Sequence, residues 1–258
     1  MADVLRVQPR DGRLDVVLNR PQVHNALNPD LLAALVEAFR QAAVREDVRY
    51  VVISGEGASF CAGADLEWMR QAAAASLEEN QQDASRVFDA LEAVAHCPKP
   101  VVARVHGAAL GGGVGLVAAC DLAVATPAAT FGLTEVRLGL VPAMILPFLL
   151  RKVHRSALPW AILTGSRFPA TRALELGLVH AVSDDPDGVV QEWGAAFLAA
   201  GPNALAEAKR LLRTLPHLAW DQAREEAVRA IAAARVSPEG QEGMRAFLER
   251  RRPAWSGP

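Results

Sequence analysis

The most glycine-rich stretch of the chain, GGGVG at residues 111–115, lies between two apolar runs. A glycine-rich turn that leads into a helix exposes free backbone N–H groups at the positive end of the helix dipole. Such groups can hold an anion or stabilise an oxyanion that develops during a reaction. No GK[ST] follows for a P-loop, and Leu116 stands where a dinucleotide fingerprint needs glycine. Close packing of a helix against a strand explains such glycines equally well.

A second turn of small residues, CAGAD at residues 61–65, follows the apolar run YVVIS. Alone it is a weak signal. Two backbone N–H groups from two separate turns can, however, converge on one oxygen, as an oxyanion hole requires. The two turns together therefore predict a site that stabilises a developing negative charge.

Glu135, in FGLTEVRLGLVP, is a lone acid among apolar neighbours. A carboxylate held against apolar surface has a raised pKa and suits general acid/base chemistry. An exposed acid paired with Arg137 is the alternative. The histidines and acids show neither HExxH nor a ligand-like cluster, so we expect no metal.

Short apolar runs alternate with helical patterns through about residue 185, and these elements must position the three features. Residues 5–7 and 14–18 flank the turn signal PRDG and predict a β-hairpin. Asn28 and Pro29 predict the start of a helix. The runs YVVIS, VVARV and AACDLAVAT predict strands that are buried on both faces. This pattern indicates an α/β fold with a largely parallel sheet covered on both sides.

The β-β-helix order recurs at intervals of roughly 40 to 50 residues, which is within the range of stacked repeats. After about residue 185 the strand signals stop and the chain becomes alanine-rich and helical. We therefore divide the chain into an α/β core at residues 1–187 and a helical region at residues 188–258. The apolar stripes of that region could pack on the core or on another subunit.

Composition limits the possible functions. The net charge of −2 gives no broad basic surface for nucleic acid, so we expect no nucleic-acid partner. Three cysteines without CxxC spacing indicate a reducing compartment with no disulfide framework. The N-terminus shows no secretory signal, and no apolar stretch is long enough to span a membrane. We expect a cytoplasmic protein with no membrane partner.

Five motifs appear in a familiar order: RPQVHNALN, SFCAGADL, HGAALGGGVGLVAACDLAVAT, FGLTEVRLGLVP and RALELGLV. On these motifs the chain resembles the enoyl-CoA hydratase/isomerase (crotonase) superfamily over roughly residues 4–252. The resemblance implies a crotonase-like spiral of repeated β-β-α units with a C-terminal helical trimerisation region. It also implies acyl-CoA thioester substrates, a homotrimer or dimer of trimers, and no cofactor besides the coenzyme A of the substrate.

The resemblance implies a role for particular residues. Backbone N–H groups of Ala64 and Gly112 would stabilise a thioester enolate, and Glu135 would act as acid and base. The residues implied in binding the substrate are Val23, His24, Ala62, Asp65, Leu66, Gly111, Phe247 and Arg250. The last two would reach the coenzyme A of a neighbouring subunit, with ordinary helix packing as the alternative.

Two positions depart from the family pattern. Gly115 stands where well-known hydratases carry a first glutamate, and PAMILPF at residues 142–148 replaces their PGxGG. The bulkier residues should reshape the acyl pocket beside Glu135. Candidates for a second acid or base, if the fold brings them near, are Asp65, Glu67, His24, His106 and His180.

Three interpretations remain open. We favour a hydratase that works through Glu135. The motifs of this chain resemble those of the branched-chain branch of the family, which includes methylglutaconyl-CoA and isohexenylglutaconyl-CoA hydratases. A Δ3,Δ2-enoyl-CoA isomerase would also need only the second glutamate. A noncatalytic binding protein on the same scaffold is the third interpretation.

Overall fold

Strands and helices alternate through the first part of the chain, and helices alone follow the last strand, as the computed structural model of residues 4–256 shows. The outermost residues of the two predicted units, 1–3 and 257–258, lie outside the described part. The strands are β1 (Leu5–Arg10), β2 (Arg13–Leu18), β3 (Tyr50–Gly55), β4 (Val101–Val105), β5 (Ala108–Leu110), β6 (Leu122–Ala125), β7 (Thr130–Gly132), β8 (Arg167–Pro169) and β9 (Ala181–Val182). The α-helices are α1 (Pro29–Val44), α2 (Leu66–Ala74), α3 (Leu77–His96), α4 (Gly112–Ala119), α5 (Leu146–Lys152), α6 (Leu158–Thr164), α7 (Ala170–Glu175), α8 (Pro186–Ala199), α9 (Pro202–Thr214), α10 (Trp220–Val236) and α11 (Pro238–Leu248).

The larger sheet has six strands in the order β1-β2-β3-β4-β6-β9. Only β1 and β2 pair antiparallel, and the other neighbours are parallel. The predicted hairpin is confirmed, with Asp11 and Gly12 at its turn, both at positive φ. The predicted strands at residues 50–54 and 101–105 and the one within AACDLAVAT are confirmed as well.

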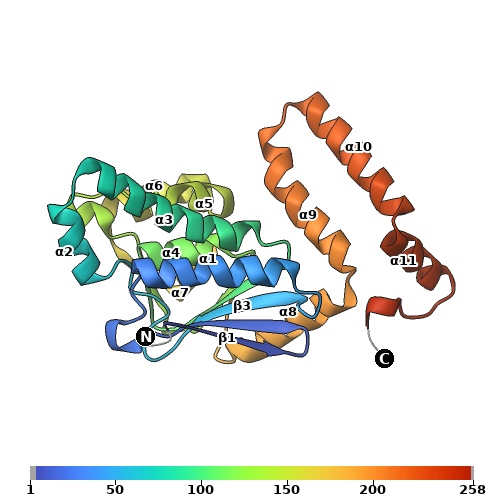
Figure 1. Cartoon of the computed structure of the whole chain (residues 1–258), viewed down its shortest axis with the longest axis horizontal. Helices are drawn as coiled ribbons and strands as arrows, with labels where there is room; N and C mark the ends of the chain where they lie inside the picture. Colours follow the sequence, from blue (N-terminus) through green and yellow to red (C-terminus); the bar gives the residue numbers. More distant parts are fainter. Residues whose placement is uncertain (1–3, 257–258) are drawn as a thin grey trace.

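Both faces of this sheet are covered, which explains the continuous apolar runs. Val51 and Ile53 of β3 belong to the main core, whereas Tyr50 and Val52 belong to a second cluster with Val190 of α8. Figure 1 shows α1 and α3 above the sheet and α8 below it. Since successive side chains of a strand point to opposite faces, burial on both sides requires apolar residues at every position.

A smaller sheet has the order β5-β7-β8, and its strand β5 follows β4 of the larger sheet along the chain. The predicted β-β-α order recurs as β1-β2-α1 and β4-β5-α4, but these two units begin at Leu5 and Val101, which is a longer interval than the roughly 40 to 50 residues predicted. The sequence did not predict β5, because we expected the strand at residues 101–105 to lead directly into the glycine turn. Instead the chain turns at Gly107, with φ of 56°, and adds the short strand.

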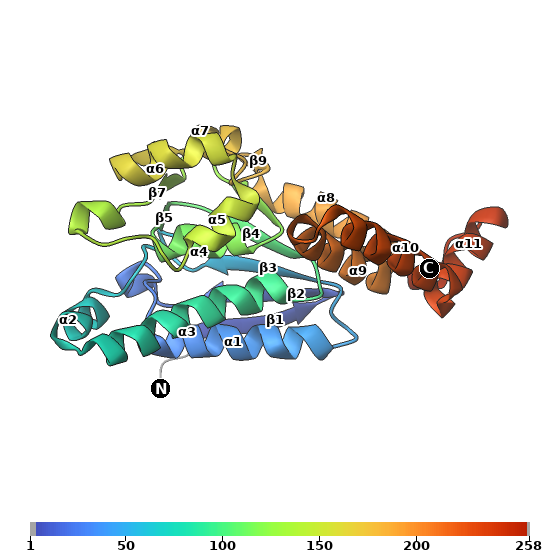
Figure 2. The same ribbon diagram turned by 90° about the horizontal axis from the view of Figure 1, so that it is seen from above.

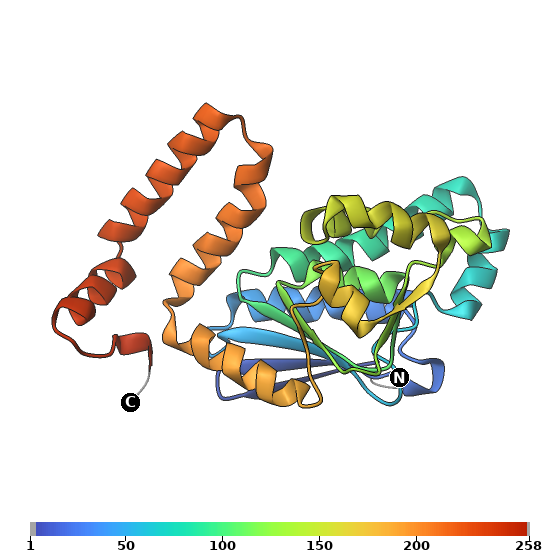
Figure 3. The same cartoon turned by 180° about the vertical axis from the view of Figure 1, so that it is seen from behind.

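Helices α9 to α11 form an arm that extends away from the body (Figures 1 and 2). Seen from behind, in Figure 3, the arm follows the end of α8. The predicted division between residues 187 and 188 falls inside α8, whose side chains pack on the larger sheet. That division stays a prediction, although the helices that leave the body begin with α9.

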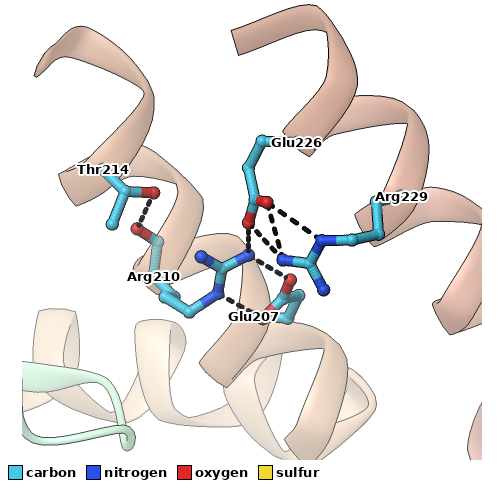
Figure 4. A network of polar contacts seen from close by, with 5 residues as sticks. All are labelled: Glu207, Arg210, Thr214, Glu226 and Arg229. Atoms are coloured by element: carbon cyan, nitrogen blue, oxygen red, sulfur yellow. Dashed lines mark hydrogen bonds and ion pairs between the residues drawn. The ribbon is translucent and has the colours of Figure 1, made fainter. Parts of the chain in front are cut away.

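Ion pairs hold the arm together internally. Arg210 of α9 contacts Glu207 at 2.7 Å and also contacts Glu226 of α10, which pairs with Arg229 (Figure 4). Glu239 of α11 accepts hydrogen bonds from the first amides of α9, including that of Asn203 at 3.0 Å. The three helices are therefore connected to one another by charged side chains as well as by packing.

Candidate active site

The three predicted catalytic positions lie at one edge of the smaller sheet because of its register. Two isolated parallel bridges, Cys61↔Ala109 and Leu27↔Ala64, extend that sheet beyond β5. β5 pairs with β7 in parallel, with Ala109 opposite Phe131. Three residues further along each segment the chain reaches Ala64, Gly112 and Thr134, next to Glu135. Parallel segments end at the same edge, so the chain brings these residues together.

Backbone hydrogen bonds fix both turns. In the first, Cys61 N–H donates to Ala108 O at 3.0 Å, and Asp65 N–H donates to Leu27 O at 2.9 Å. In the second, Gly111 N–H donates to Gly132 O at 2.9 Å. Within residues 4–256, neither the amide of Ala64 nor that of Gly112 donates to another protein group. The two amides are therefore free donors, and both residues lie at this edge of the sheet.

Gly111 has φ of 49°, a left-handed conformation that glycine adopts without steric cost. A Cβ atom added to Gly111 would lie 3.1 Å from Glu135 Oε1, so a side chain at this position would press on the carboxylate. Gly112 follows as the first residue of α4, where a helix amide has no intrahelical partner. The glycines therefore let the backbone approach the carboxylate and leave one amide free.

Glu135 opens a short 3-10 helix at residues 135–138, directly after β7. Its Oε2 atom is buried and has no hydrogen-bond partner among the described residues. Burial raises the pKa of the Glu135 carboxyl. Arg137 does not neutralise it, because the Arg137 guanidinium points to Thr164 O and Ser166. The paired-acid interpretation is therefore wrong, and the carboxylate is held as an acid/base group would be.

A small pocket of about 150 Å³ joins these groups. It contains Ala64, Gly112 and Glu135, and the rest of its wall is apolar. The other residues that line it are Leu27, Trp68, Val87, Val141, Pro142, Met144 and Ile145. Glu135 is the one ionisable side chain in this wall. The pocket thus combines two free amides and one carboxylate in an apolar setting.

Gly115 lies inside α4 and is fully enclosed. A Cβ atom built on Gly115 would overlap Ile145 Cγ2 and lie 3.1 Å from Ile145 Cβ and 3.2 Å from Leu91 Cδ1. No space therefore exists for a carboxylate at this position. Gly115 and the bulky segment PAMILPF are therefore linked by packing, since Ile145 occupies the place beside Gly115.

The candidates for a second acid or base lie outside this pocket wall. Asp65 pairs with Arg20 at 2.7 Å and accepts from Glu67 N–H at 2.8 Å as the N-cap of α2. Burial alone would raise the pKa of Asp65, but the hydrogen bonds from Arg20 and the α2 amide hold it below its ordinary value. Glu67 is exposed and pairs with Arg70.

The three candidate histidines make contacts of their own. His24 Nδ1 lies 3.1 Å from Ser59 Oγ, and His106 Nε2 lies 2.8 Å from Gly57 O. His180 Nδ1 accepts from Ala123 N–H at 3.1 Å. Burial lowers the pKa of His180, together with the nearby Lys152. None of the three lines the pocket that holds Glu135.

The predicted substrate-binding residues fall into two groups. Val23, His24 and Leu66 are exposed, and Ala62 N–H donates to His24 O at 3.0 Å, so these four lie around the first turn. Phe247, 83% exposed, belongs to α11, and Arg250 follows that helix; α11 lies far from α2 in Figures 1 and 2. Their predicted contact concerns a neighbouring subunit and stays a prediction.

Sequence reasoning missed several residues that shape the site. Trp68 lines the pocket and donates its indole N–H to Asp83 of α3 at 2.7 Å. Asn25 is fully buried and donates to Glu56 O and Ser59 O. Ile145 was visible only as part of a bulky segment. The motif RPQVHNAL contained Asn25, but its role depends on carbonyls that are 31 and 34 residues further along the chain.

A larger cleft of about 500 Å³ lies between body and arm and is lined by Arg151, Lys152 and Arg213, among others. It contains neither the free amides nor Glu135.

Among residues 4–256, no group of three or more His, Cys, Asp or Glu side chains is placed to hold a metal ion. No helix of the described part is long and apolar enough to cross a membrane.

Comparison with known proteins agrees with the predicted fold. The profile of the enoyl-CoA hydratase/isomerase family matches residues 10–258. The 2,3-dehydroadipyl-CoA hydratase of Escherichia coli is 33% identical over 248 residues, which cover 94% of each chain. The crystal structure of an enoyl-CoA hydratase from Shewanella pealeana superposes with a TM-score of 0.95, at 36% identity, over 98% of this chain and 96% of that one. An enoyl-CoA hydratase from Mycobacterium smegmatis gives 0.93 at 37% identity, over 98% and 99%. These similarities confirm the α/β spiral.

Proposed function

The chain belongs to the enoyl-CoA hydratase/isomerase family, and we propose that it is an enoyl-CoA hydratase that works with a single carboxylate. One observation carries the proposal: Glu135, with a buried and unpartnered oxygen, shares an apolar pocket with the free amides of Ala64 and Gly112. The substrate is an acyl-CoA thioester with an α,β double bond. Homologues named as hydratases support this choice within the family.

The proposed reaction starts with the thioester oxygen at the amides of Ala64 and Gly112. Glu135, as a carboxylate, takes a proton from water while the water oxygen bonds to the β-carbon. The electron pair of the double bond moves onto the thioester oxygen, where the two amides stabilise the enolate. Glu135 then returns its proton to the α-carbon, and the product is a 3-hydroxyacyl-CoA. A carboxyl whose pKa is raised by burial suits both transfers.

The main alternative is a Δ3,Δ2-enoyl-CoA isomerase. It is favoured by the same single carboxylate, since a proton shuttle between the α- and γ-carbons needs one group and no water. Glu135 would take the proton from the α-carbon and deliver it to the γ-carbon. The enolate would be held by the same two amides.

Incubation with 2-enoyl-CoA and 3-enoyl-CoA in H₂¹⁸O separates the two reactions. We expect ¹⁸O in a 3-hydroxyacyl-CoA formed from the 2-enoyl substrate. Migration of the double bond without label would assign the chain as an isomerase. Turnover of neither substrate by a protein that still binds acyl-CoA would support the noncatalytic interpretation.

The assembly and the acyl group belong to the proposal as well. The exposed apolar residues of the arm support a homotrimer or a dimer of trimers, in which Phe247 and Arg250 would approach a neighbouring subunit's site. A branched acyl chain is the motif-based expectation for the substrate. A screen of linear, branched and carboxylated enoyl-CoAs tests it directly.

A further inference from the structure

We propose that Ile145 determines which acyl groups this site accepts, and that these are uncharged chains of about four to six carbons. This inference rests on the proposed function, because it treats the pocket beside Glu135 as the acyl site. Four observations carry it: the position of Ile145, its fixed backbone, the polarity of the wall, and the volume of the pocket.

Ile145 forms one wall of the pocket, beside Gly115. Its side chain is 3% exposed, and it fills the space into which a side chain at Gly115 would project. The same isoleucine lines the pocket that contains Glu135. Ile145 is therefore both a packing partner of α4 and a wall of the acyl site.

The local backbone holds this wall in place. The amides of Ile145 and Leu146 both donate to Pro142 O, at 3.3 and 3.0 Å. The carbonyl of Ile145 accepts from Phe148 and Leu149 at the start of α5. An isoleucine is also stiff at χ1, because two heavy atoms branch from its Cβ. The wall cannot move aside easily for a longer chain.

The wall offers no partner for a charged end of the acyl group. None of the ten residues that line the pocket is cationic. The indole N–H of Trp68, which would be a donor, is already bonded to Asp83 at 2.7 Å. A carboxylate buried without a partner is strongly disfavoured. The pocket therefore selects against carboxylated acyl groups.

The volume of the pocket limits the length of the acyl chain that it can hold. A pocket of about 150 Å³ matches an apolar cavity that takes up benzene, a molecule of about six carbons. Longer chains would have to displace Ile145 or stay in water. Each methylene that enters an apolar site contributes about fourfold in affinity, so the end of the pocket should be visible in a chain-length series.

The test measures binding of butyryl-, hexanoyl-, octanoyl- and decanoyl-CoA by calorimetry, with free coenzyme A as the baseline. For the wild type we expect affinity to rise by up to about fourfold per methylene to hexanoyl-CoA and then stop rising. Ile145→Ala should extend the rise to octanoyl-CoA, and Ile145→Val should shift it less. Leu149→Ala, a buried neighbour on α5 that does not line the pocket, should keep the wild-type profile.

Glutaryl-CoA and pentanoyl-CoA, which have equal carbon numbers, test the polarity. We expect glutaryl-CoA to bind at least about tenfold more weakly. Equal binding of the two, or identical length profiles for wild type and Ile145→Ala, would overturn the inference. Saturated thioesters cannot react, so the length profile is read without turnover. A length profile with no hydration of enoyl-CoAs would refute the proposed function alone, whereas turnover with a flat profile would refute the inference alone.

Discussion

Glu135 shows at the scale of a single residue how function and stability conflict. Its Oε2 atom is buried and unpartnered, which costs stability in the ionised form. The same burial raises the carboxyl pKa and keeps the group able to exchange protons. A residue placed in this way is explained by chemistry better than by packing.

Replacing the carboxyl by an amide tests its role. Glu135→Gln keeps the size but cannot accept a proton, so we expect kcat to fall by about 100-fold or more. Steady-state kinetics with a 2-enoyl-CoA measure this fall in kcat. Calorimetric binding of a saturated acyl-CoA checks that the substrate site of the variant is intact. Turnover close to that of the wild type would remove Glu135 from the mechanism.

The pH dependence follows from the direction of the pKa shift. The working form of Glu135 is the carboxylate, so kcat/KM should rise with pH and reach half its maximum above the ordinary carboxyl pKa of 4.5. A raised pKa means that the folded state holds the proton more tightly, so this group's contribution to stability is lost as pH rises through the raised pKa. Glu135→Gln should therefore gain melting temperature relative to the wild type as pH rises above the ordinary carboxyl pKa of 4.5. A constant difference between the two proteins would contradict the shift.

Gly112 can be tested by removing one donor only. Proline at the first position of a helix is tolerated but has no N–H, so Gly112→Pro should lower kcat by about 100-fold. Gly112→Ala is the matched control, because its added Cβ meets Leu27 Cδ1 at 2.6 Å just as proline would, while the N–H remains. Comparable losses in the two folded variants would show that crowding, and not the amide, is responsible.

At the scale of elements, the site depends on how the turns are anchored. Arg20 reaches 45 residues along the chain to pair with Asp65, and Asp65 caps α2 next to Ala64. At the other end of α4, the Lys152 ammonium donates to Val117 O and Cys120 O at 2.9 and 2.7 Å. Burial lowers the pKa of Lys152 to about 8. Charged groups thus anchor the first turn and the C-terminal end of α4, the helix that the glycine turn begins.

Breaking the Arg20–Asp65 pair should loosen the first turn. Both side chains are largely buried, so Asp65→Ala should lower the free energy of unfolding by about 3 kcal/mol. It should also lower kcat, because the Ala64 amide loses its fixed position. Asp65→Asn keeps a capping oxygen and should lose less.

Glu67→Ala is the matched control on the same turn, since it breaks an exposed pair worth at most about 1 kcal/mol. Denaturant unfolding and steady-state kinetics are measured on all three variants. An Asp65→Ala variant as stable and active as Glu67→Ala would show that the pair does not position the site.

At the scale of the whole molecule, the arm carries several of the most exposed large apolar side chains. Trp220, Phe247 and Leu248 are 86%, 83% and 80% exposed, on helices that extend from the body (Figure 3). Large apolar side chains that stay exposed along one part of a molecule are typical of a surface where proteins associate. The body has two buried cores, but it also carries exposed apolar side chains, such as Val44 on α1 at 80%.

Light scattering on the purified protein measures its mass in solution and so tests the proposed association through the arm. We expect the mass of a trimer or a dimer of trimers. Combining Trp220→Asp with Phe247→Asp should reduce that mass, because burying an unpaired charge in an interface is costly. Val44→Asp, at an equally exposed apolar position on α1, should leave it unchanged. A monomeric wild type would contradict the proposal.

The sequence by itself determined the local elements and the candidate residues. Apolar runs gave the strands because both sheet faces are buried, and the glycine stretch and Glu135 were visible as residue types. Tertiary structure alone decided what these residues do together. The register Cys61↔Ala109 and Ala109↔Phe131 places Ala64, Gly112 and Glu135 at one edge, across about 70 residues of chain. Likewise, only packing shows that Ile145 fills the space beside Gly115, because contacts between distant segments depend on how the strands pair and not on local sequence.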